Sequence, residues 1–261
     1  MNAIAVILQK EWWELRRERS LLATLLFLPA LITAIGLGTT YGLGRAPDDD
    51  TAMLGAATAD PALAGLPTEQ LGQVIMGRQF GLLLLLLPMV LPSLLAAYSI
   101  IGEKSRRTLE PLLATPVRDW ELLLAKSLGA VIPPLLMTWA CAAIYAAGIA
   151  LVSLTPDVAG LIVTPAWTLM LAICSPLLAL IAVAASVLIS ARVNDPRTAQ
   201  NLSGVLVVPF MALFFGQLVG LVVPNLGFVL AFAAALAALA ALAIWAAARL
   251  FARETILTRW R

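Results

Sequence analysis

The stretch FGLLLLLLPMVLPSLLAAYSII, which runs from Phe80 to Ile101, decides the fold class of this chain. It contains no charged residue, and its leucines form an unbroken run over 82–87. An α-helix of about 20 apolar residues is long enough to cross the hydrocarbon core of a bilayer. Since every backbone polar group must be satisfied internally in lipid, we expect this stretch to be a transmembrane helix.

Five more apolar runs have the same character, so we predict an all-α integral membrane protein with six transmembrane helices. The expected spans cover about 21–43, 80–101, 127–154, 165–191, 203–223 and 227–248. The composition agrees, because 61% of the 261 residues are hydrophobic and only 12% are charged. A soluble domain is about half apolar and about a quarter charged. The whole chain, 1–261, is therefore expected to form a single transmembrane domain.

Basic residues are distributed unevenly between the connections. Most of the 17 Lys and Arg residues fall in the N-terminal segment, the connections after the second and fourth spans, and the C-terminal segment. Only Arg45 and Arg78 fall on the other side. Lys and Arg are enriched in cytoplasmic loops. We therefore expect both termini in the cytoplasm, in a multi-pass protein of a bacterial or archaeal (inner) cell membrane.

Residues 1–20 are expected to form an interfacial helix before the first span. Ile4, Leu8, Trp12 and Leu15 fall on one face of such a helix. Trp with flanking Arg is typical of the headgroup region of a membrane. A basic anchoring helix with no part in transport is an equally good interpretation.

The connection after the second span, 102–126, holds the most specific motif, GEKSRRTLEPLLATPV. Thr108 fits the N-cap of a short helix, and Pro116 discourages its continuation. The apolar side chains of this helix share one face: Leu109, Leu112 and Leu113. A helix of about two turns is unstable alone, so we expect it to dock on a soluble partner. The alternative is a positively charged loop with incidental amphipathicity.

This motif resembles that of the permeases of type-2 ATP-binding-cassette (ABC) transporters: an acid-base pair, then Thr-x-Glu-x-Leu-Leu, then Thr-Pro-Val. In that family the segment is the coupling helix, which seats in a groove of a separate nucleotide-binding ATPase subunit. The residues that match the motif are Glu103, Arg107, Thr108, Glu110, Leu112, Leu113 and Pro116, and Arg106 and Leu109 complete the expected coupling set. The N-terminal run KEWWELRR and the C-terminal run FARETIL are also similar to the family. Two residues within the motif depart from the family: Arg107 stands where many members have Gly, and Pro111 occupies a usually variable position.

The resemblance further implies a half-permease that pairs in membrane lipid with a second copy of itself or with a paralogous permease. Two Gly-x-x-x-Gly patterns would let helix backbones approach closely. They lie in the first and fifth spans, which the resemblance places at the dimer interface: Gly38, Gly42, Gly216 and Gly220.

Several kinds of site are not expected in this chain. It has no Gly-x-x-x-x-Gly-Lys-Ser/Thr phosphate loop, so we expect ATP and Mg on the partner subunit and no cofactor here. It has no His, and Cys141 and Cys174 fall in apolar runs, so neither a metal site nor a catalytic site is expected. Arg78, beside Gln73 and Gln79, is the nearest candidate for a functional charge, and a snorkelling side chain is the preferred interpretation. No nucleic-acid partner is expected.

Together these features predict the permease subunit of an ATP-driven ABC exporter, not itself an enzyme, with a hydrophobic or amphipathic cargo. Its path is expected to include Thr33, Thr39, Thr138 and Ser93. The first alternative is a mechanotransmitter, which acts on an extracytoplasmic partner without moving a cargo. The second is a membrane-embedded enzyme, against which the absence of His and of paired intramembrane carboxylates argues.

Overall fold

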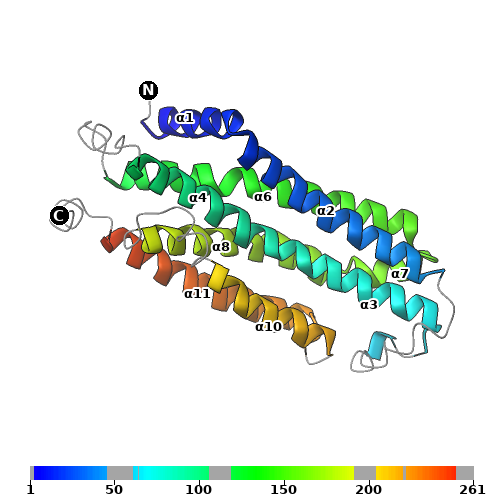
Figure 1. Ribbon diagram of the computed structural model, residues 1–261. Coiled ribbons are helices and arrows are strands. Elements are labelled where there is room, and N and C mark those ends of the chain that lie inside the picture. Colours follow the sequence, from blue (N-terminus) through cyan, green and yellow to red (C-terminus); the bar gives the residue numbers. More distant parts are fainter. Residues whose placement is uncertain are drawn as a thin grey trace.

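The computed structural model describes residues 3–45, 61–63, 65–105, 119–190, 204–219 and 222–250. In this part of the chain all the regular secondary structure is helical, and the long helices run side by side (Figure 1). The α-helices are α1 (Ala3–Arg17), α2 (Arg19–Leu43), α3 (Thr68–Leu83), α4 (Leu87–Ser105), α6 (Asp119–Val152), α7 (Pro156–Ile162), α8 (Pro165–Ser190), α10 (Val207–Leu218) and α11 (Leu226–Leu250). Short 3-10 turns cover Pro61–Leu63, Leu84–Leu86 and Gly204–Leu206.

The two ends of the bundle hold different parts of the chain. At one end, on the left of Figure 1, lie α1 and the points where α4 ends, α6 begins, and α8 and α11 end. We call it the basic end, after the basic residues of these elements: Lys10, Arg16, Arg17, Lys126 and Arg249. At the other end, which we call the distal end, lie α7 and the start of α11.

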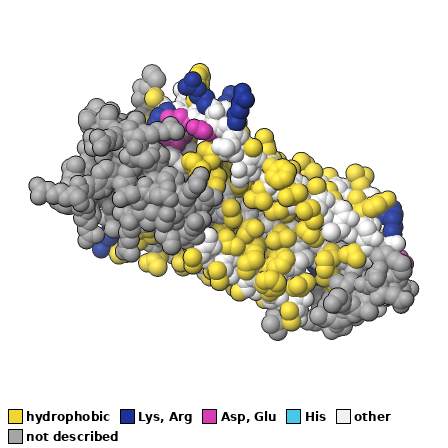
Figure 2. Space-filling view, in the orientation of Figure 1, with side chains coloured by type: hydrophobic (Ala, Val, Ile, Leu, Met, Phe, Trp, Pro, Cys, Tyr) yellow, Lys and Arg dark blue, Asp and Glu magenta, His cyan; other side chains and the backbone are white. Residues whose placement is uncertain are grey.

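Within the described residues, five helical segments are long and apolar enough to cross a membrane. They are Arg19–Leu43, Thr68–Ser99, Leu124–Val152, Pro156–Ile189 and Leu226–Ala247. Figure 2 shows hydrophobic side chains over the middle of the visible face, with the visible charged side chains towards its ends. An apolar middle between two charged ends is the surface that a lipid bilayer requires. The chain is therefore a multi-pass membrane protein.

The second span begins earlier than the sequence predicts. Its helix starts at Thr68, not near residue 80, and continues through α3, a 3-10 turn and α4. The polar side chains of the added turns have partners inside the bundle. Gln73 Nε2 donates to Thr40 O (2.9 Å), and Gln79 Nε2 donates to a carbonyl oxygen of α10 (3.0 Å). A hydropathy profile places the start of the span after these polar residues. Their hydrogen bonds inside the bundle nevertheless allow them to be buried within it.

Pro88 explains the 3-10 turn in the middle of this span. Proline has no N–H, so residue 88 cannot donate to the carbonyl of Leu84 as a regular α-helix requires. The N–H of Leu87 donates to Leu84 O instead, which is the tighter i to i+3 pattern of a 3-10 helix. The Leu84 carbonyl thus has a hydrogen-bond partner, and the helix continues as α4.

The fifth expected span, 203–223, is only partly helical in the described residues. α10 has 12 residues, which corresponds to about 18 Å, whereas the hydrocarbon core is about 30 Å thick. Helix length therefore does not confirm the six-span count. However, α8 ends at the basic end and α11 starts at the distal end, so the chain between them runs along the bundle (Figure 1). α10 forms the part of this passage nearer the distal end.

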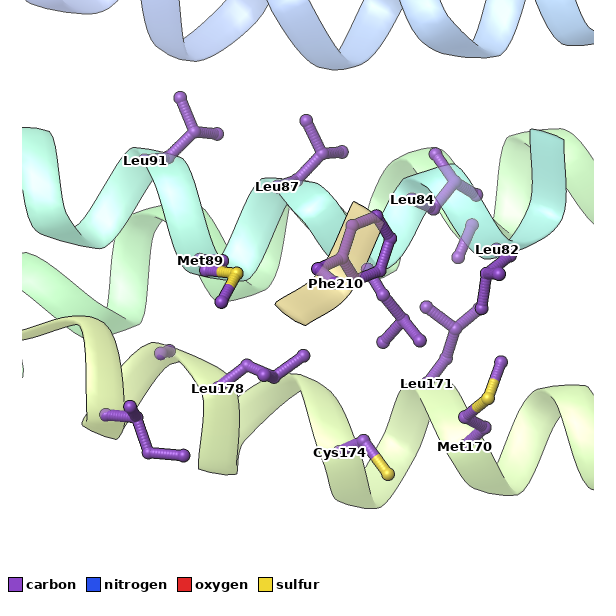
Figure 3. Packing of buried hydrophobic residues seen from close by; sticks show 14 of the residues in the cluster. Leu82, Leu84, Leu87, Met89, Leu91, Met170, Leu171, Cys174, Leu178 and Phe210 are labelled. Carbon is purple, nitrogen blue, oxygen red and sulfur yellow. The ribbon is translucent and has the colours of Figure 1, made fainter. Parts of the chain in front are cut away.

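The continuous α3–α4 helix lies at the centre of the packing. In its most apolar window 78% of the residues are buried, compared with 22% in α2 and in α11. α4 packs on α6 and α8, α2 packs on α3 and α6, and α11 packs on α8. Figure 3 shows Phe210 of α10 between the α3–α4 helix and α8. α2 and α11 therefore have the largest apolar faces left for lipid or for another chain.

Three hydroxyl side chains that were expected along a cargo path are buried in the bundle. Each donates to a backbone carbonyl of its own helix at 2.8 Å: Thr33, Thr138 and Ser93. Such a bond satisfies the hydroxyl without any other partner. Within one chain these residues therefore pack between helices and line no open path.

Candidate coupling site

The predicted coupling segment joins two helices that the structure places side by side. α4 ends at Ser105, and α6 begins at Asp119; the two helices pack against each other. Glu103 lies in the last turn of α4. The other expected coupling residues lie outside the described residues: Arg106, Arg107, Thr108, Leu109, Glu110, Leu112, Leu113 and Pro116. The structure thus defines the two helices that carry this segment.

A buried polar cluster, formed by Glu11, Ser99 and Lys126, connects both of these helices to α1. Lys126 Nζ lies 3.0 Å from Glu11 Oε1 and donates to Ser99 Oγ at 3.1 Å. Ser99 Oγ donates to Glu11 Oε2 at 2.9 Å. The side chains of Lys126 and Glu11 are only 3% and 10% exposed. This cluster of one ion pair and two hydrogen bonds to Ser99 therefore joins α1, the last third of α4 and the first third of α6.

Because both charges are buried, this ion pair holds α1 firmly against the bundle. Two charges removed from water are costly, and their mutual attraction offsets this cost only while both remain in place. Removal of one partner of a buried pair typically costs about 3–5 kcal/mol of stability. α1 is therefore held to the two helices that flank the coupling segment by a contact that cannot be broken without a large penalty.

Apolar contacts hold α1 to α6 on the N-terminal side of the ion pair. Ile7 of α1 packs with Leu122 and Ala125 of α6. Gly129 of α6 allows a close approach, because a Cβ at this position would lie 3.0 Å from Glu11 Cβ. α1 is thus docked on the bundle along its own length.

The protein-facing side of α1 differs from the predicted face. Ile7 and Leu15 are buried, whereas Trp12 is 42% exposed and Trp13 is 65% exposed. The guanidinium carbon of Arg16 lies 5.6 Å from the centre of the Trp12 ring. The pairing of Glu11 with Lys126 turns α1 so that both tryptophans point away from the bundle, where they suit a membrane interface.

Sequence reasoning missed this cluster. Lys126 was counted among the basic residues of the connection 102–126, but it lies inside α6 and is 4% exposed. A signal was present, because Lys126 follows the apolar run 122–125, and a charge within an apolar helix needs a partner. The identity of that partner, more than a hundred residues away in the sequence, could not be read from spacing.

The glycines of the predicted dimer interface lie on two different helices. Gly38 and Gly42 are exposed on α2, and no atom lies within 4 Å of a Cβ built on either. Gly216 lies on α10, where such a Cβ would be 3.2 Å from Val222 Cγ2. Gly220 lies outside the described residues. α3 contacts both α2 and α10 and lies between them in Figure 1.

Arg78 has a different environment from the snorkelling side chain that the sequence favoured. It lies on α3, is half-buried, and its Nε donates to Leu161 O of α7 at 2.7 Å. The arginine thus bonds within the protein at the distal end. Among the described residues, no group of three or more His, Cys, Asp or Glu side chains could hold a metal ion.

Comparison with known proteins agrees with this architecture. Residues 5–243 match the family described as "ABC-2 family transporter protein". This range includes α1 from residue 5 onward, the first four candidate spans, and the whole connection between α4 and α6. It ends at residue 243, a few residues before the end of the last candidate span, Leu226–Ala247. No curated protein matches the chain. The chain therefore belongs to the ABC-2 family of transporter proteins, as a multi-pass permease component of an ABC transporter.

Proposed function

We propose that this chain is the permease subunit of an ATP-driven exporter and that its basic end faces the cytoplasm. ATP and Mg bind to a separate ATPase subunit, which docks on the coupling segment between α4 and α6. Family membership implies such an ATPase partner and a dimeric arrangement. The observation that carries the proposal is the buried cluster of Glu11, Ser99 and Lys126, which joins the two helices flanking that segment.

A force on the coupling segment would pass directly into the bundle. α4 is continuous with α3 through a 3-10 turn, and together they form a candidate span of 32 residues, Thr68–Ser99, or about 48 Å. This segment lies at the centre of the packing, so its displacement moves its neighbours α6 and α8. The ion pair adds α1 to the moving unit. The basic end and the distal end are thus connected by one continuous helix.

The orientation and the six crossings form one proposal. Lys and Arg favour the cytoplasmic side, and α1, the end of α4 and the end of α11 lie together at the basic end. The passage between α8 and α11 then completes an even number of crossings, with α10 as its distal part. Both termini are accordingly cytoplasmic.

Two such chains would form the complete permease. Gly38 and Gly42 leave a smooth strip on the lipid-facing side of α2, which allows a close approach of another helix. The partner is a second copy or a paralogous permease, and Gly216 and Gly220 belong to the same interface. Since Thr33, Ser93 and Thr138 are buried within the single chain, a path for a hydrophobic or amphipathic cargo would form between the two halves.

The coupling proposal is tested with substitutions in the segment 106–118. Glu110→Arg, or Leu112→Asp together with Leu113→Asp, is expected to abolish permease-dependent stimulation of the ATPase subunit in proteoliposomes, because the docking face is lost. Membrane insertion and thermal stability should be unchanged. Glu14→Arg is the matched control, since Glu14 is exposed at the same end of the molecule. Wild-type stimulation by both coupling variants would refute the assignment of this segment.

A further inference from the structure

Six prolines lie inside the membrane spans, distributed over four helices. They are Pro29 in α2, Pro88 and Pro92 in α4, Pro133 and Pro134 in α6, and Pro176 in α8. Five of these side chains are buried, and Pro176 is half-buried. The proline rings therefore face the inside of the bundle, where the four helices pack on one another.

A contact near the basic end aligns α4 with α6. Lys126 of α6 donates to the hydroxyl of Ser99 of α4 at 3.1 Å. From this contact towards the distal end, Pro133 is seven residues further along α6, and Pro92 is seven residues further along α4. Each residue of an α-helix advances about 1.5 Å along its axis. These two prolines therefore lie at about the same height in the bundle.

A second contact, nearer the distal end, aligns α2 with the α3–α4 helix. A Cβ on Gly36 of α2 would lie 2.8 Å from Phe80 Cβ of α3. Towards the basic end, Pro29 is seven residues from Gly36, and Pro88 is eight residues from Phe80. These two prolines are thus at one height as well, about one helical turn from Pro92.

The proline of α8 lies at this height too. Figure 3 shows Leu178, two residues from Pro176, opposite the turn of α4 that holds Leu87 and Met89. That turn includes Pro88. The six prolines therefore form one layer across the bundle, about two helical turns thick, which we call the proline layer.

Each of the four helices is weakened where it crosses this layer. A proline has no N–H for the carbonyl four residues earlier, and its ring clashes with that carbonyl, so helices kink at proline. Thr33 donates to Pro29 O and Thr138 donates to Pro134 O, each at 2.8 Å, and such bonds often bend helices further. The 3-10 turn Leu84–Leu86 lies directly on the distal side of the layer. All four helices are therefore least stiff at the same height.

Hydrogen bonds between helices hold the bundle together on both sides of the proline layer. On the distal side, the side chains of Gln73 and Tyr145 connect α2, α3 and α6. On the basic side, the cluster of Glu11, Ser99 and Lys126 connects α1, α4 and α6. The bundle thus has two cross-linked halves, one on each side of the layer.

The proline layer itself is filled mainly by apolar side chains. In the described part of the chain, the nearest side-chain hydrogen bonds between helices lie at its two edges, where Trp139 donates to Ser175 and Ser186 donates to Ser93 O. The buried apolar side chains at this height, shown in Figure 3, are Leu87, Met89, Leu91, Leu178 and Phe210. Apolar contacts have no preferred direction, and methionine adapts to a changed surface. The layer can therefore change shape without loss of a directional bond.

α11 has no proline and would have to follow such a change without bending. It packs on α8, and its buried residues include Ala233, Ala240 and Ala247 at every seventh position. Packed helices can slide past one another over small distances. The small side chains on this face of α11 allow such a movement along α8.

We propose that the proline layer is a hinge, at which the basic half of the bundle tilts as one unit against the distal half. Because the prolines share one height, four packed helices bend together. Bends at different heights would separate neighbouring helices that are closely packed. In the exporter, a pull on the coupling segment produces this tilt and changes the gap between two permease chains. That last step rests on the proposed function, whereas the hinge itself does not.

Hydrogen–deuterium exchange tests the hinge with the purified full chain in detergent, without an ATPase subunit. Backbone amides within 85–93 and 130–138 are expected to exchange about tenfold faster than those within 73–80 and 142–150, because helices open first where a hydrogen bond is missing. Pro92→Ala restores an N–H that can donate to Pro88 O. It should slow exchange in 85–93 about tenfold, and Pro133→Ala together with Pro134→Ala should do the same in 130–138.

Pro165→Ala is the matched control. Pro165 is the first residue of α8, where an N–H has no partner within the helix, so this substitution should leave exchange in both hinge segments unchanged. The role of the hinge in coupling is measured separately, as permease-dependent stimulation of the ATPase subunit in proteoliposomes. Both hinge variants are expected to lower this stimulation at least about threefold without a lower melting temperature, because each gains helix hydrogen bonds but bends less easily. Pro165→Ala should stimulate like wild type.

Three outcomes would overturn the proposal. The first is wild-type exchange that is no faster in 85–93 and 130–138 than in the flanking segments, and it needs no variant to fold. The second is unchanged exchange in the folded hinge variants. The third is slower exchange with wild-type stimulation, which would remove the hinge from coupling. If the wild-type chain stimulates no ATPase subunit, the exporter proposal fails, and the exchange experiment still decides whether the hinge exists.

Discussion

The ammonium group of Lys126 lies between α1 and α4, 3.0 Å from the Glu11 carboxylate and 3.1 Å from the Ser99 hydroxyl. Lys126→Met removes the charge and leaves Glu11 buried opposite an apolar side chain. We expect the free energy of unfolding to fall by about 3–5 kcal/mol. Thermal unfolding in detergent, followed with a thiol-reactive dye, would measure this, since Cys141 and Cys174 are buried free thiols that unfolding exposes.

A double variant and a surface pair serve as controls for this residue. Glu11→Gln combined with Lys126→Met removes both charges, so much of the lost stability should return. Lys10→Met removes the pair of Lys10 with Glu14, whose side chains are 40% and 53% exposed, and should cost less than about 1 kcal/mol. A loss for Lys126→Met that is no larger than that for Lys10→Met would show that the buried pair holds α1 only weakly.

At the scale of one element, α3 depends on the amide of Gln73. Its Nε2 donates to Thr40 O at 2.9 Å, and its Oε1 accepts from the Leu154 N–H at 3.1 Å. The side chain thus joins the distal end of α3 to the ends of α2 and α6. Gln73→Leu leaves the Thr40 carbonyl and the Leu154 N–H without this partner. We expect the free energy of unfolding to fall by about 1–3 kcal/mol for each of these groups that water does not reach.

Hydrogen–deuterium exchange would locate the effect of Gln73→Leu. Faster exchange is expected at the start of α3 and around residue 154, with little change at the basic end. Gln9→Leu, an exposed position on α1, is the matched control. Uniform exchange changes along the whole bundle would contradict a role limited to the distal end.

The same element illustrates what hydropathy can and cannot predict. The apolar middle of each long helix is evident in the sequence, because a run of about 20 apolar residues is typical of a transmembrane helix. The start of α3 at Thr68 was not evident, since it depends on partners for Gln73 and Gln79 that lie on other helices. In the expected span 203–223, the described α-helix covers only Val207–Leu218. Apolar composition alone does not determine where a helix begins and ends.

For the candidate sites, the sequence predicts segments better than it predicts contacts. The motif after the second span resembled that of ABC permeases, and the family match assigns the chain to such a family. The role of the connection between α4 and α6 stays a prediction. The cluster of Glu11, Ser99 and Lys126 was not predicted, because each member has an ordinary role when it is considered alone.

At the scale of the whole molecule, the exposed strip of α2 should decide how two chains pair. Gly38→Leu places a large side chain where no atom of the same chain lies within 4 Å. Stability of the single chain should therefore hardly change, whereas a close helix–helix contact would be blocked. We expect a weakening of dimerisation of about tenfold or more, measured by light scattering of the detergent-solubilised chain over a concentration series. Gly160→Leu on α7 is the control, because no atom lies within 4 Å of a Cβ there either. If Gly38→Leu and Gly42→Leu dimerise like wild type and like this control, α2 is not the interface, and the lipid-facing side of α11 becomes the surface to test.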